Sequence, residues 1–253
     1  MELGIVLMGA LVGLLVGLTG VGGASLLTPL LLLLGIPATV AVGTDLFYNS
    51  ITKLFGSIQH IRQRTLDWML VLYLAAGSIP GAVLAISLLK FYPPLHDYQE
   101  QVIKHALGIV LIFVALVSLA KVWFVRFDNG RIQNKPLSQK RLLTISIGLV
   151  LGFIVGLTSI GSGSLFALAM MLFYRLSAAQ LVGTDIVHAF LLVTAASLMH
   201  AGFGHINYML ALNLLIGSVP GVLIGSRLTA KLPPKPLRTV MATIIFISGL
   251  KLI

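Results

Sequence analysis

The chain contains no cysteine and very few charged residues. Without cysteine, its 253 residues can form neither a disulfide nor a thiolate metal site. Only seven residues are acidic, and charged residues make up 9% of the chain against 58% hydrophobic residues. With a mean hydropathy of +1.04, so much apolar surface cannot be hidden inside a water-soluble domain of this size. The composition therefore predicts a chain that lies mostly in the lipid bilayer.

The formal net charge of +10 does not indicate a nucleic-acid partner. The 17 Lys and Arg residues fall between apolar stretches and do not cluster with aromatic residues, which is typical of membrane-topology signals. No segment has metal-ligand spacing, a phosphate loop between a strand and a helix, or a serine nucleophile motif. We therefore expect no nucleic-acid partner, no metal, no cofactor and no enzymatic activity.

An internal duplication organises the chain. Residues 13–26, GLLVGLTGVGGASL, recur as GFIVGLTSIGSGSL at residues 152–165, and a Val-Gly-Thr-Asp tetrapeptide follows each copy. We divide the chain into a first membrane repeat (1–121), a basic cytoplasmic linker (122–141) and a second membrane repeat (142–253). The closest similarity between the repeats is polar, glycine-rich and helix-breaking.

Each repeat reads as one interrupted apolar segment followed by three apolar spans. In the first repeat the segments are residues 3–34, interrupted at Thr19 to Gly23, then 38–60, 66–89 and 102–121. In the second repeat they are residues 142–174, interrupted at Thr158 to Gly163, then 178–200, 207–230 and 237–253. The uninterrupted segments are long enough to cross a hydrocarbon core of roughly 30 Å. The sequence thus predicts an all-α polytopic membrane protein.

The interrupted segments do not fit one crossing each. As helices, residues 3–18 would be about 24 Å long and residues 24–34 about 16 Å long. The second piece is too short to cross alone, so we expect a re-entrant helical hairpin in each repeat. Irregular backbone inside a membrane persists only where protein or a water-filled cavity satisfies it, so the glycine-rich tips are expected to face inward.

Basic residues predict the orientation of the two repeats. The linker from Lys121 to Arg141 holds six Lys and Arg residues against one acid, Asp128, and we place it in the cytoplasm. A hairpin crosses an even number of times and three spans follow it, so the repeats have opposite orientations. Such inverted-topology repeats place a binding site near the midplane at broken helices and exchange access by rocking. Because inverted-repeat carriers are commonly dimers, a homodimer is also an expectation.

The tips have the chemistry of an anion site. A helix that starts after each glycine-rich break presents unpaired N–H groups at the positive end of its dipole. Glycines allow close approach of the backbone to a ligand, and hydroxyls add hydrogen bonds. The predicted substrate-binding residues are Thr19, Gly22, Gly23, Ser25, Thr158, Gly161, Ser162 and Ser164. The alternative is close helix packing through small residues, which explains Gly9, Gly13 and Gly17 well.

Two acidic residues lie inside apolar segments, at equivalent places in the repeats. A carboxylate in the bilayer interior costs roughly 2.5 to 3.5 kcal/mol, so Asp45 and Asp185 are candidates for coupling or for organising the site. Asn49 and His188 lie on the same helix faces and join them as candidates. An N-cap or a polar contact between helices explains the two carboxylates equally well. Lys53 could neutralise a substrate anion, although snorkelling toward the cytoplasmic end is the favoured interpretation.

The third segment of each repeat carries a proline between glycines. The sequences are GSIPG at Gly77 to Gly81 and GSVPG at Gly217 to Gly221. A proline in a helix removes one backbone hydrogen bond and frees a carbonyl, which kinks the helix. We predict that Pro80 and Pro220 act as hinges, while a kink that serves packing is the simpler alternative.

Together, these motifs resemble those of the TauE/SafE family of sulfite and organosulfonate exporters. The resemblance covers essentially the whole chain. It is carried by the duplicated glycine-rich segment, the V-G-T-D tetrapeptides, the short G-I-P-A-T between them and the G-S-x-P-G pair. The resemblance implies a bacterial or archaeal inner-membrane permease for small sulfur oxyanions or sulfonates, with both hairpins in contact with substrate. In the second copy, Gly20, Gly23 and Ala24 become Ser159, Ser162 and Gly163, so the two tips differ chemically.

The chemistry of the tips predicts a small anion, and the family resemblance implies its export. The predicted function is therefore export of a small anion, most notably sulfite or an organosulfonate such as sulfoacetate. In this hypothesis the anion is held at the glycine-rich helix N-termini and access alternates between the two sides. A gated anion channel, or a permease for another small anion, remains the alternative. An intramembrane enzyme or a structural subunit would lack a catalytic constellation in this sequence.

Overall fold

The chain is helical throughout the part that the computed structural model describes, residues 3–19, 24–93, 97–123, 133–134, 136–229 and 234–253. The helices of the first repeat are α1 (Leu3–Thr19), α2 (Ala24–Leu33), α3 (Ala38–Arg62), α4 (Trp68–Phe91) and α6 (Gln99–Trp123). A short 3-10 helix, η1 (Leu137–Lys140), leads to α8 (Arg141–Thr158), α9 (Ser164–Phe173), α10 (Ala178–Gly202), α11 (Tyr208–Thr229) and α12 (Pro234–Leu250). Each predicted segment is confirmed as helix, with ends that agree within a few residues.

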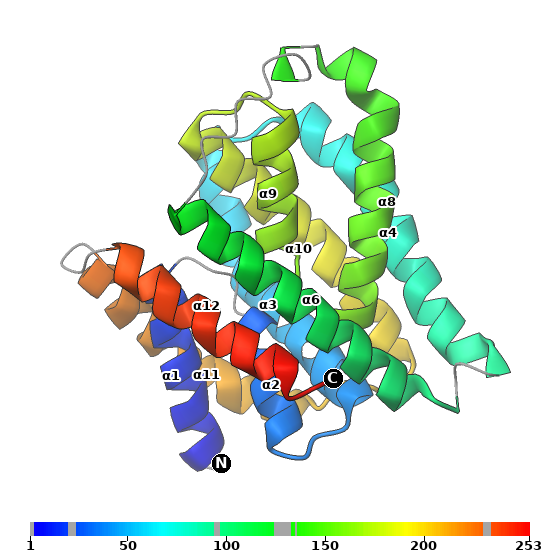
Figure 1. Cartoon of the computed structure of the whole chain (residues 1–253), viewed down its shortest axis with the longest axis vertical. Coiled ribbons are helices and arrows are strands. Elements are labelled where there is room, and N and C mark those ends of the chain that lie inside the picture. Colours follow the sequence, from blue (N-terminus) through cyan, green and yellow to red (C-terminus); the bar gives the residue numbers. More distant parts are fainter. Residues whose placement is uncertain (1–2, 20–23, 94–96, 124–132, 135, 230–233) are drawn as a thin grey trace.

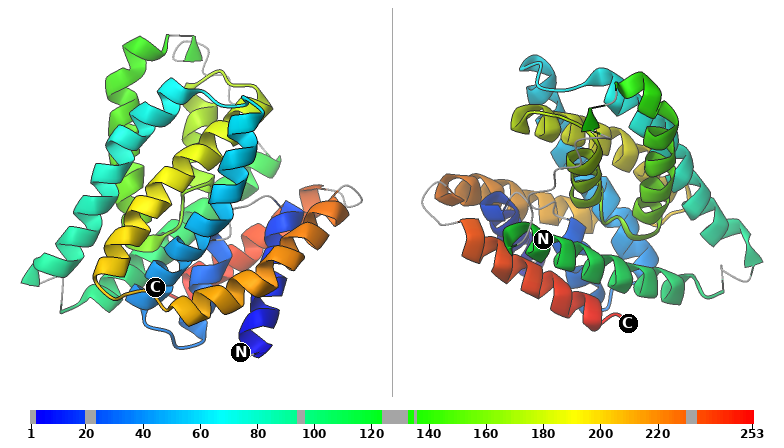
Figure 2. Two further views of the ribbon diagram at one scale, coloured as in Figure 1. Left: turned by 180° about the vertical axis from the view of Figure 1, so that it is seen from behind. Right: turned by 45° about the horizontal axis from the view of Figure 1, so that its top comes forward.

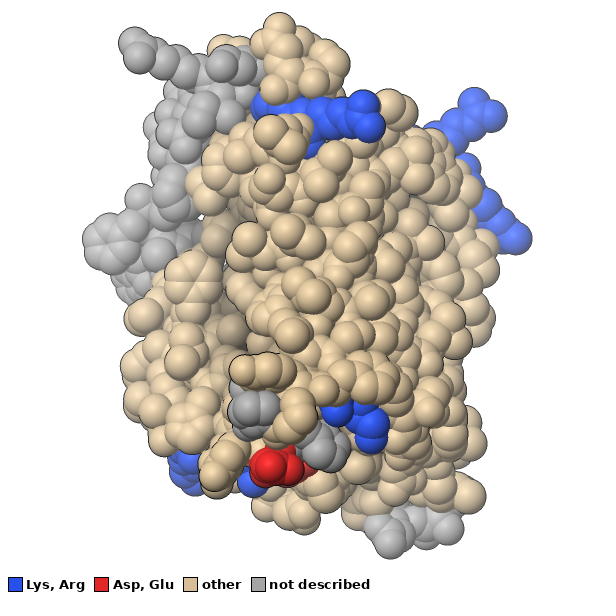
Figure 3. Space-filling model, turned by 90° about the vertical axis from the view of Figure 1, so that its right-hand side faces the viewer, with Lys and Arg blue, Asp and Glu red and all other residues tan. Residues whose placement is uncertain are grey.

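The helices have the length and surface of a membrane protein. Within the described ranges, five segments are long and apolar enough to cross a membrane: Trp68–Phe91, Gln99–Leu119, Leu137–Thr158, Ala178–Gly202 and Tyr208–Leu228. Figure 3 shows one face of the molecule, on which charged side chains gather toward the upper and lower ends and uncharged residues cover the middle. An uncharged band of this kind is what a hydrocarbon core requires. The predicted all-α polytopic membrane fold is confirmed.

The predicted break in the second repeat is present, and the one in the first repeat falls at residues 20–23, outside the described part of the chain. In the first repeat, α1 ends at Thr19 and α2 begins at Ala24; in the second, α8 ends at Thr158 and α9 begins at Ser164. The second helix of each pair, α2 and α9, has only 10 residues, or about 15 Å. Neither is long enough to cross a bilayer, so each repeat begins with one long and one short helix joined at a break.

The helices of the two repeats pack against each other in a reciprocal pattern. The first helix of each repeat packs most extensively on the fourth of the other, so α1 contacts α11 and α8 contacts α4. The central helices α3 and α10 pack together, as do α6 and α12, and both pairs lie side by side in Figures 1 and 2. Each helix break is therefore attached to helices of both repeats.

Glycine makes the α1–α11 and α4–α8 contacts close. A Cβ atom added to Gly152 would lie 2.1 Å from the carbonyl oxygen of Ser78, and one added to Gly217 would lie 1.9 Å from that of Val6. Those distances leave no room for any side chain. The glycines that meet the backbone of the partner helix are Gly9, Gly13, Gly17, Gly77, Gly81, Gly148, Gly152, Gly156, Gly217, Gly221 and Gly225. The packing explanation for the first three is confirmed, and it extends to both glycines of each G-S-x-P-G motif.

The V-G-T-D tetrapeptides hold the two repeats together. The Thr44 hydroxyl accepts a hydrogen bond from the Asn207 backbone N–H at 3.1 Å, and the Thr184 hydroxyl accepts one from the Asp67 N–H at 3.0 Å. Asn207 and Asp67 are equivalent residues that precede α11 and α4, and each side chain accepts from the N–H three residues on, at 3.0 Å. Each threonine thus fixes the start of a helix in the other repeat.

Candidate functional site

The second helix break presents a helix N-terminus inside the bundle. After α8, Ser159 adopts a left-handed φ of 63° and Gly161 a φ of 104°. Gly163 is the N-cap residue of α9, and no side chain caps the helix at that position. The side chains of Thr158, Ser159 and Ser162 are at most 3% exposed. In the first turn of α9 the Leu165 and Phe166 N–H groups donate to the Gly161 carbonyl oxygen, at 3.2 and 3.4 Å. The positive end of the helix dipole lies at this turn and stabilises an anion nearby.

Asp45 connects this break to the first repeat. The residue lies in α3 with none of its surface exposed. Its carboxylate accepts hydrogen bonds from Thr28 Oγ1 in α2 at 2.8 Å, from Asn49 Nδ2 at 2.8 Å and from the Ser159 hydroxyl. Asn49 Nδ2 also donates to the Asp45 carbonyl oxygen at 2.9 Å. One carboxylate thereby ties together α2, α3 and the break between α8 and α9, while its role in coupling or in organising a site stays a prediction.

Asp185, the residue equivalent to Asp45, has a basic neighbour. A Cβ atom added to Gly163 would lie 3.6 Å from Asp185 Oδ2 and also 3.6 Å from Lys53 Nζ. Lys53 belongs to α3 of the other repeat, and both Asp185 and Asp45 are near enough to interact with it electrostatically. An ammonium group and a carboxylate therefore meet at the N-cap of α9.

His188 lies beside the same helix N-terminus. The residue is fully buried, and its ring centroid is 4.3 Å from that of Phe166 in the first turn of α9. Its Nε2 atom is 2.9 Å from Ser78 Oγ in α4, whereas Nδ1 has no hydrogen-bond partner among the described residues. Lys53 is near enough to interact electrostatically with the ring. The imidazole therefore has one nitrogen available to a ligand.

Comparison with known proteins identifies the family. A family model described as "Sulfite exporter TauE/SafE" matches residues 5–252. The chain belongs to the TauE/SafE family. The resemblance carried by the sequence motifs is thus confirmed.

Relatives of this TauE/SafE chain occur in bacteria and archaea. The "Probable membrane transporter protein YjnA" of Bacillus subtilis (strain 168) is 60% identical over 254 residues, which is 100% of each chain. The "Probable membrane transporter protein YunE" of the same organism is 26% identical over 98% of this chain and 96% of its own. "Probable membrane transporter protein MJ0441" of Methanocaldococcus jannaschii is 24% identical over 97% of this chain and 93% of its own. No solved structure matches the chain. The family and these names make the chain a membrane transporter.

Several predicted residues come together in this TauE/SafE transporter. The second break and the helix ends beside it contain four of them, Thr158, Gly161, Ser162 and Ser164. Two more, Asp185 and His188, lie next to this break on α10. In the first repeat, Ser25 is buried in the first turn of α2. Gly22 and Gly23 lie outside the described residues, as does the side chain of Thr19. Within the described part of the chain, no group of three His, Asp or Glu side chains could hold a metal ion.

Two predicted residues lie away from the break. Pro80 and Pro220 are exposed on α4 and α11, and both helices continue without interruption through them. The glycines on either side of each proline pack against the neighbouring helix, as described above. Their role as hinges stays a prediction.

Gly161 is constrained by the fold as well as by any ligand. Its φ of 104° strains every residue with a side chain, and an added Cβ atom would lie 2.7 Å from Leu165 Cδ1. A substitution there would disturb the backbone together with the site. Gly163, where the nearest atoms to an added Cβ lie at 3.6 Å, is the better position for testing the site alone.

Three residues of the site were not predicted as such. Thr28 and Ser159 bind Asp45, and Lys53 approaches Gly163 although the favoured interpretation placed it at the membrane boundary. That interpretation of Lys53 was wrong because the side chain ends beside a buried helix N-terminus and a carboxylate. The available signal was spacing, since Lys53 follows Asp45 by eight residues and so lies on the same helix face.

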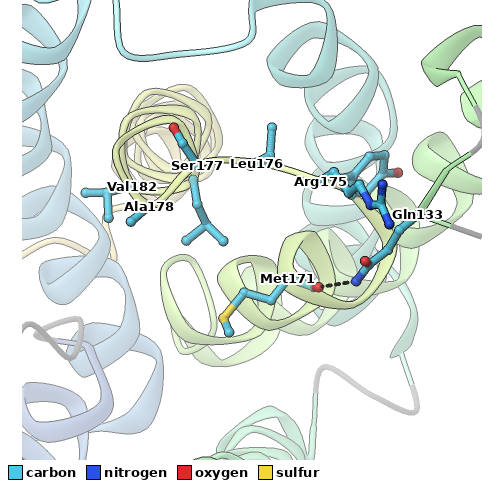
Figure 4. A pocket seen from close by; sticks show the side chains of 9 residues that line it. Gln133, Met171, Arg175, Leu176, Ser177, Ala178 and Val182 are labelled. Atoms are coloured by element: carbon cyan, nitrogen blue, oxygen red, sulfur yellow. Dashed lines mark hydrogen bonds between the residues drawn. The ribbon is translucent and has the colours of Figure 1, made fainter. Parts of the chain in front are cut away.

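A separate pocket of about 660 Å³ lies where the second hairpin joins α10 (Figure 4). Gln133 Nε2, from the linker, donates to the carbonyl oxygens of Met171 at 3.0 Å and Leu172 at 3.3 Å. Lys140 Nζ donates to the carbonyl oxygen of Phe173 at 3.0 Å and lies 4.6 Å from the centroid of the Tyr174 ring. These contacts satisfy carbonyl groups at the end of α9, so the linker anchors the short helix.

Proposed function

We propose that the chain is an alternating-access carrier that exports a small anion, sulfite or an organosulfonate such as sulfoacetate. The observation that carries the proposal is the buried N-terminus of α9, which lies beside the Lys53 ammonium group in a bundle of apolar helices. Positive charge in an apolar interior is costly without a counter-charge, and a bound anion can take over from the Asp185 carboxylate as the counter-charge of Lys53. The buried Ser164 hydroxyl oxygen, which has no hydrogen-bond partner among the described residues, and the positive end of the α9 dipole suit an oxyanion.

The arrangement of the helices supports an inverted-topology repeat. In Figure 1, α1 begins at the lower end of the molecule, near both chain termini, and α8 begins at the upper end next to the basic linker. We infer that the two hairpins enter the membrane from opposite sides. We also infer that the protein lies in the inner membrane and that its linker faces the cytoplasm. No nucleic acid enters this function, and a homodimer stays part of the proposal.

The reciprocal packing supports a particular pair of moving units. Because α1 packs closely on α11 and α8 on α4, each hairpin is fixed to a helix of the other repeat. Rocking would then move α1 with α11 against α8 with α4, and each unit would contain helices of both repeats. Pro80 and Pro220, on the exposed sides of α4 and α11, would let those helices bend.

Counterflow in proteoliposomes tests the proposed function. Purified protein would be reconstituted, and exchange of labelled sulfite, sulfoacetate, sulfate and acetate would be measured with and without a proton gradient. Saturable exchange restricted to sulfur oxyanions supports the carrier. Passage of anions that neither saturates nor shows counterflow would instead indicate a gated channel, and no movement of any anion would contradict the proposal.

A further inference from the structure

We infer that the chain holds an anion site at the second helix break, in which the Lys53 ammonium provides the counter-charge. This inference rests on the proposed function and specifies its binding site. Lys53 Nζ lies 3.6 Å from the position of an added Gly163 Cβ atom, so the ammonium is next to the first turn of α9. The full positive charge and the helix dipole thus act on the same small volume.

His188 is an independent sign of a ligand at this place. The residue is fully buried, and its Nδ1 atom lacks a hydrogen-bond partner among the described residues. A buried polar atom without a partner is costly, and its cost is removed when a ligand binds it. If Ser78 donates to Nε2, the Nδ1–H group becomes a donor. The site then combines an ammonium, an imidazole N–H and the positive end of the α9 dipole.

The first repeat has no equivalent of the lysine. Val193, fully buried in α10, occupies the position that corresponds to Lys53. In the first repeat Asp45 already accepts three side-chain hydrogen bonds, from Thr28, Asn49 and Ser159. Duplication would permit two sites, but the basic side chain is present on one side only. The two repeats therefore build one site together.

The charges at the site select the class of anion. Lys53 contributes one positive charge, and Asp185 places one negative charge beside it. Beside Lys53 and Asp185 a monoanion leaves one negative charge uncompensated and a dianion leaves two, so the dianion is the more costly ligand in a poorly hydrated interior. The favoured substrates are therefore small monoanionic oxyanions, such as hydrogensulfite or a simple alkanesulfonate. Sulfate, which is a dianion, is disfavoured.

Substitution of Lys53 tests the counter-charge. Saturable counterflow of labelled methanesulfonate would be measured for wild type, Lys53→Gln and Lys53→Arg. Lys104→Gln, which removes an exposed basic residue of α6, is the matched control. We expect Lys53→Gln to lose saturable exchange, Lys53→Arg to retain part of it, and Lys104→Gln to match wild type. The melting temperature of each variant in detergent checks that it is folded.

Substitution of Gly163 provides a second test that does not remove the lysine. An aspartate at this N-cap fits the available space and can cap α9, so Gly163→Asp should fold. Its carboxylate would occupy the place of the anion beside Lys53, and we expect exchange to be lost. Gly163→Asn has the same shape without the charge, and it should retain more exchange than Gly163→Asp.

The outcomes separate this inference from the proposed function. Exchange of methanesulfonate by wild type, with an unchanged apparent KM in Lys53→Gln, would overturn the role of Lys53 and leave the carrier standing. Equal exchange in Gly163→Asp and Gly163→Asn would overturn the location of the site. Faster exchange of sulfate than of methanesulfonate would overturn the charge selection. No exchange of any anion by wild type would contradict the proposed function itself.

Discussion

Asp45 and Asp185 occupy equivalent positions in the two repeats and have different surroundings. Asp45 is fully buried and accepts hydrogen bonds from Thr28, Asn49 and Ser159. Asp185 is 9% exposed and lies with Lys53 at the N-cap of α9. Three neutral side-chain donors bind Asp45, whereas Asp185 shares the N-cap of α9 with Lys53, which also interacts electrostatically with Asp45.

This difference separates two roles that a duplicated sequence would make identical. Neutral hydrogen bonds from three elements fix the geometry of Asp45, which suits a structural connection between the hairpins. A basic side chain at a helix N-terminus can exchange a neighbouring carboxylate for another anion, which suits binding. The duplication supplied two similar frameworks, and in the proposed account Lys53 makes the second of them the anion site.

Removal of Asp45 should give the largest loss of stability. In Asp45→Ala, the donors on Thr28, Asn49 and Ser159 lose their common acceptor, and an unsatisfied buried polar group costs roughly 1–3 kcal/mol. We expect the free energy of unfolding to fall by about 3 kcal/mol, as measured by denaturation in detergent.

A double-mutant cycle is the control for Asp45. Thr28→Val alone should lower the free energy of unfolding by about 1 kcal/mol. When it is added to Asp45→Ala, it should lower that free energy little further. Additive losses would mean that Thr28 and Asp45 do not depend on each other, and the structural connection would be wrong.

Neutralisation of Asp185 should act on binding. In Asp185→Asn, the negative charge that competes for Lys53 is removed, and about 1.4 kcal/mol of electrostatic competition corresponds to a tenfold change in affinity. We expect the apparent KM for methanesulfonate to fall about tenfold and sulfate exchange to increase. A raised KM in this variant would indicate that Asp185 assists binding, which contradicts the proposed competition.

Ser159 allows the hydrogen bond to Asp45 to be separated from backbone strain. Ser159→Ala loses the hydroxyl and keeps the left-handed φ of 63°, whereas Ser159→Gly, which restores the residue of the first repeat, relieves the strain. We expect Ala to lower the free energy of unfolding by about 1 to 2 kcal/mol and Gly to lower it by about 1 kcal/mol less. Equal losses would mean that the backbone conformation contributes nothing.

Replacement of the two prolines should have the smallest effect on stability. Pro80 and Pro220 are exposed, so Pro80→Ala and Pro220→Ala should change the free energy of unfolding by less than about 1 kcal/mol. If they act as hinges, each variant should exchange anions more slowly at an unchanged apparent KM, measured by counterflow. Unchanged exchange rates in both would remove the hinge interpretation and leave packing by the adjacent glycines.

The sequence predicts the fold well because apolar length and helix-breaking residues are local signals. The interruption in the second repeat lies where expected, since glycines and hydroxyl residues between apolar runs disfavour continued helix. The packing role of Gly9, Gly13 and Gly17 could likewise be read from their four-residue spacing. The choice of partner helix could not, because the same glycine spacing fits several neighbours.

The site was predicted less completely, because its residues are brought together by tertiary packing. Ser159 and Asp45 are 114 positions apart, and nothing local to either residue predicts their contact. Lys53 was expected at the membrane boundary because lysine side chains usually extend toward water. In the structure its ammonium group lies instead beside the N-terminus of α9. The lysine was visible as a departure from the repeat, since Val193 occupies the equivalent position.

Protection of a single thiol would test the central claim most directly. Because the chain has no cysteine, Ser164→Cys carries one thiol, at the first turn of α9. The rate of its alkylation by N-ethylmaleimide would be measured with and without methanesulfonate, in the wild-type and Lys53→Gln backgrounds. The account predicts that the anion slows alkylation when Lys53 is present and has no effect when it is absent. Alkylation at one rate under all four conditions would contradict an anion site at this helix break.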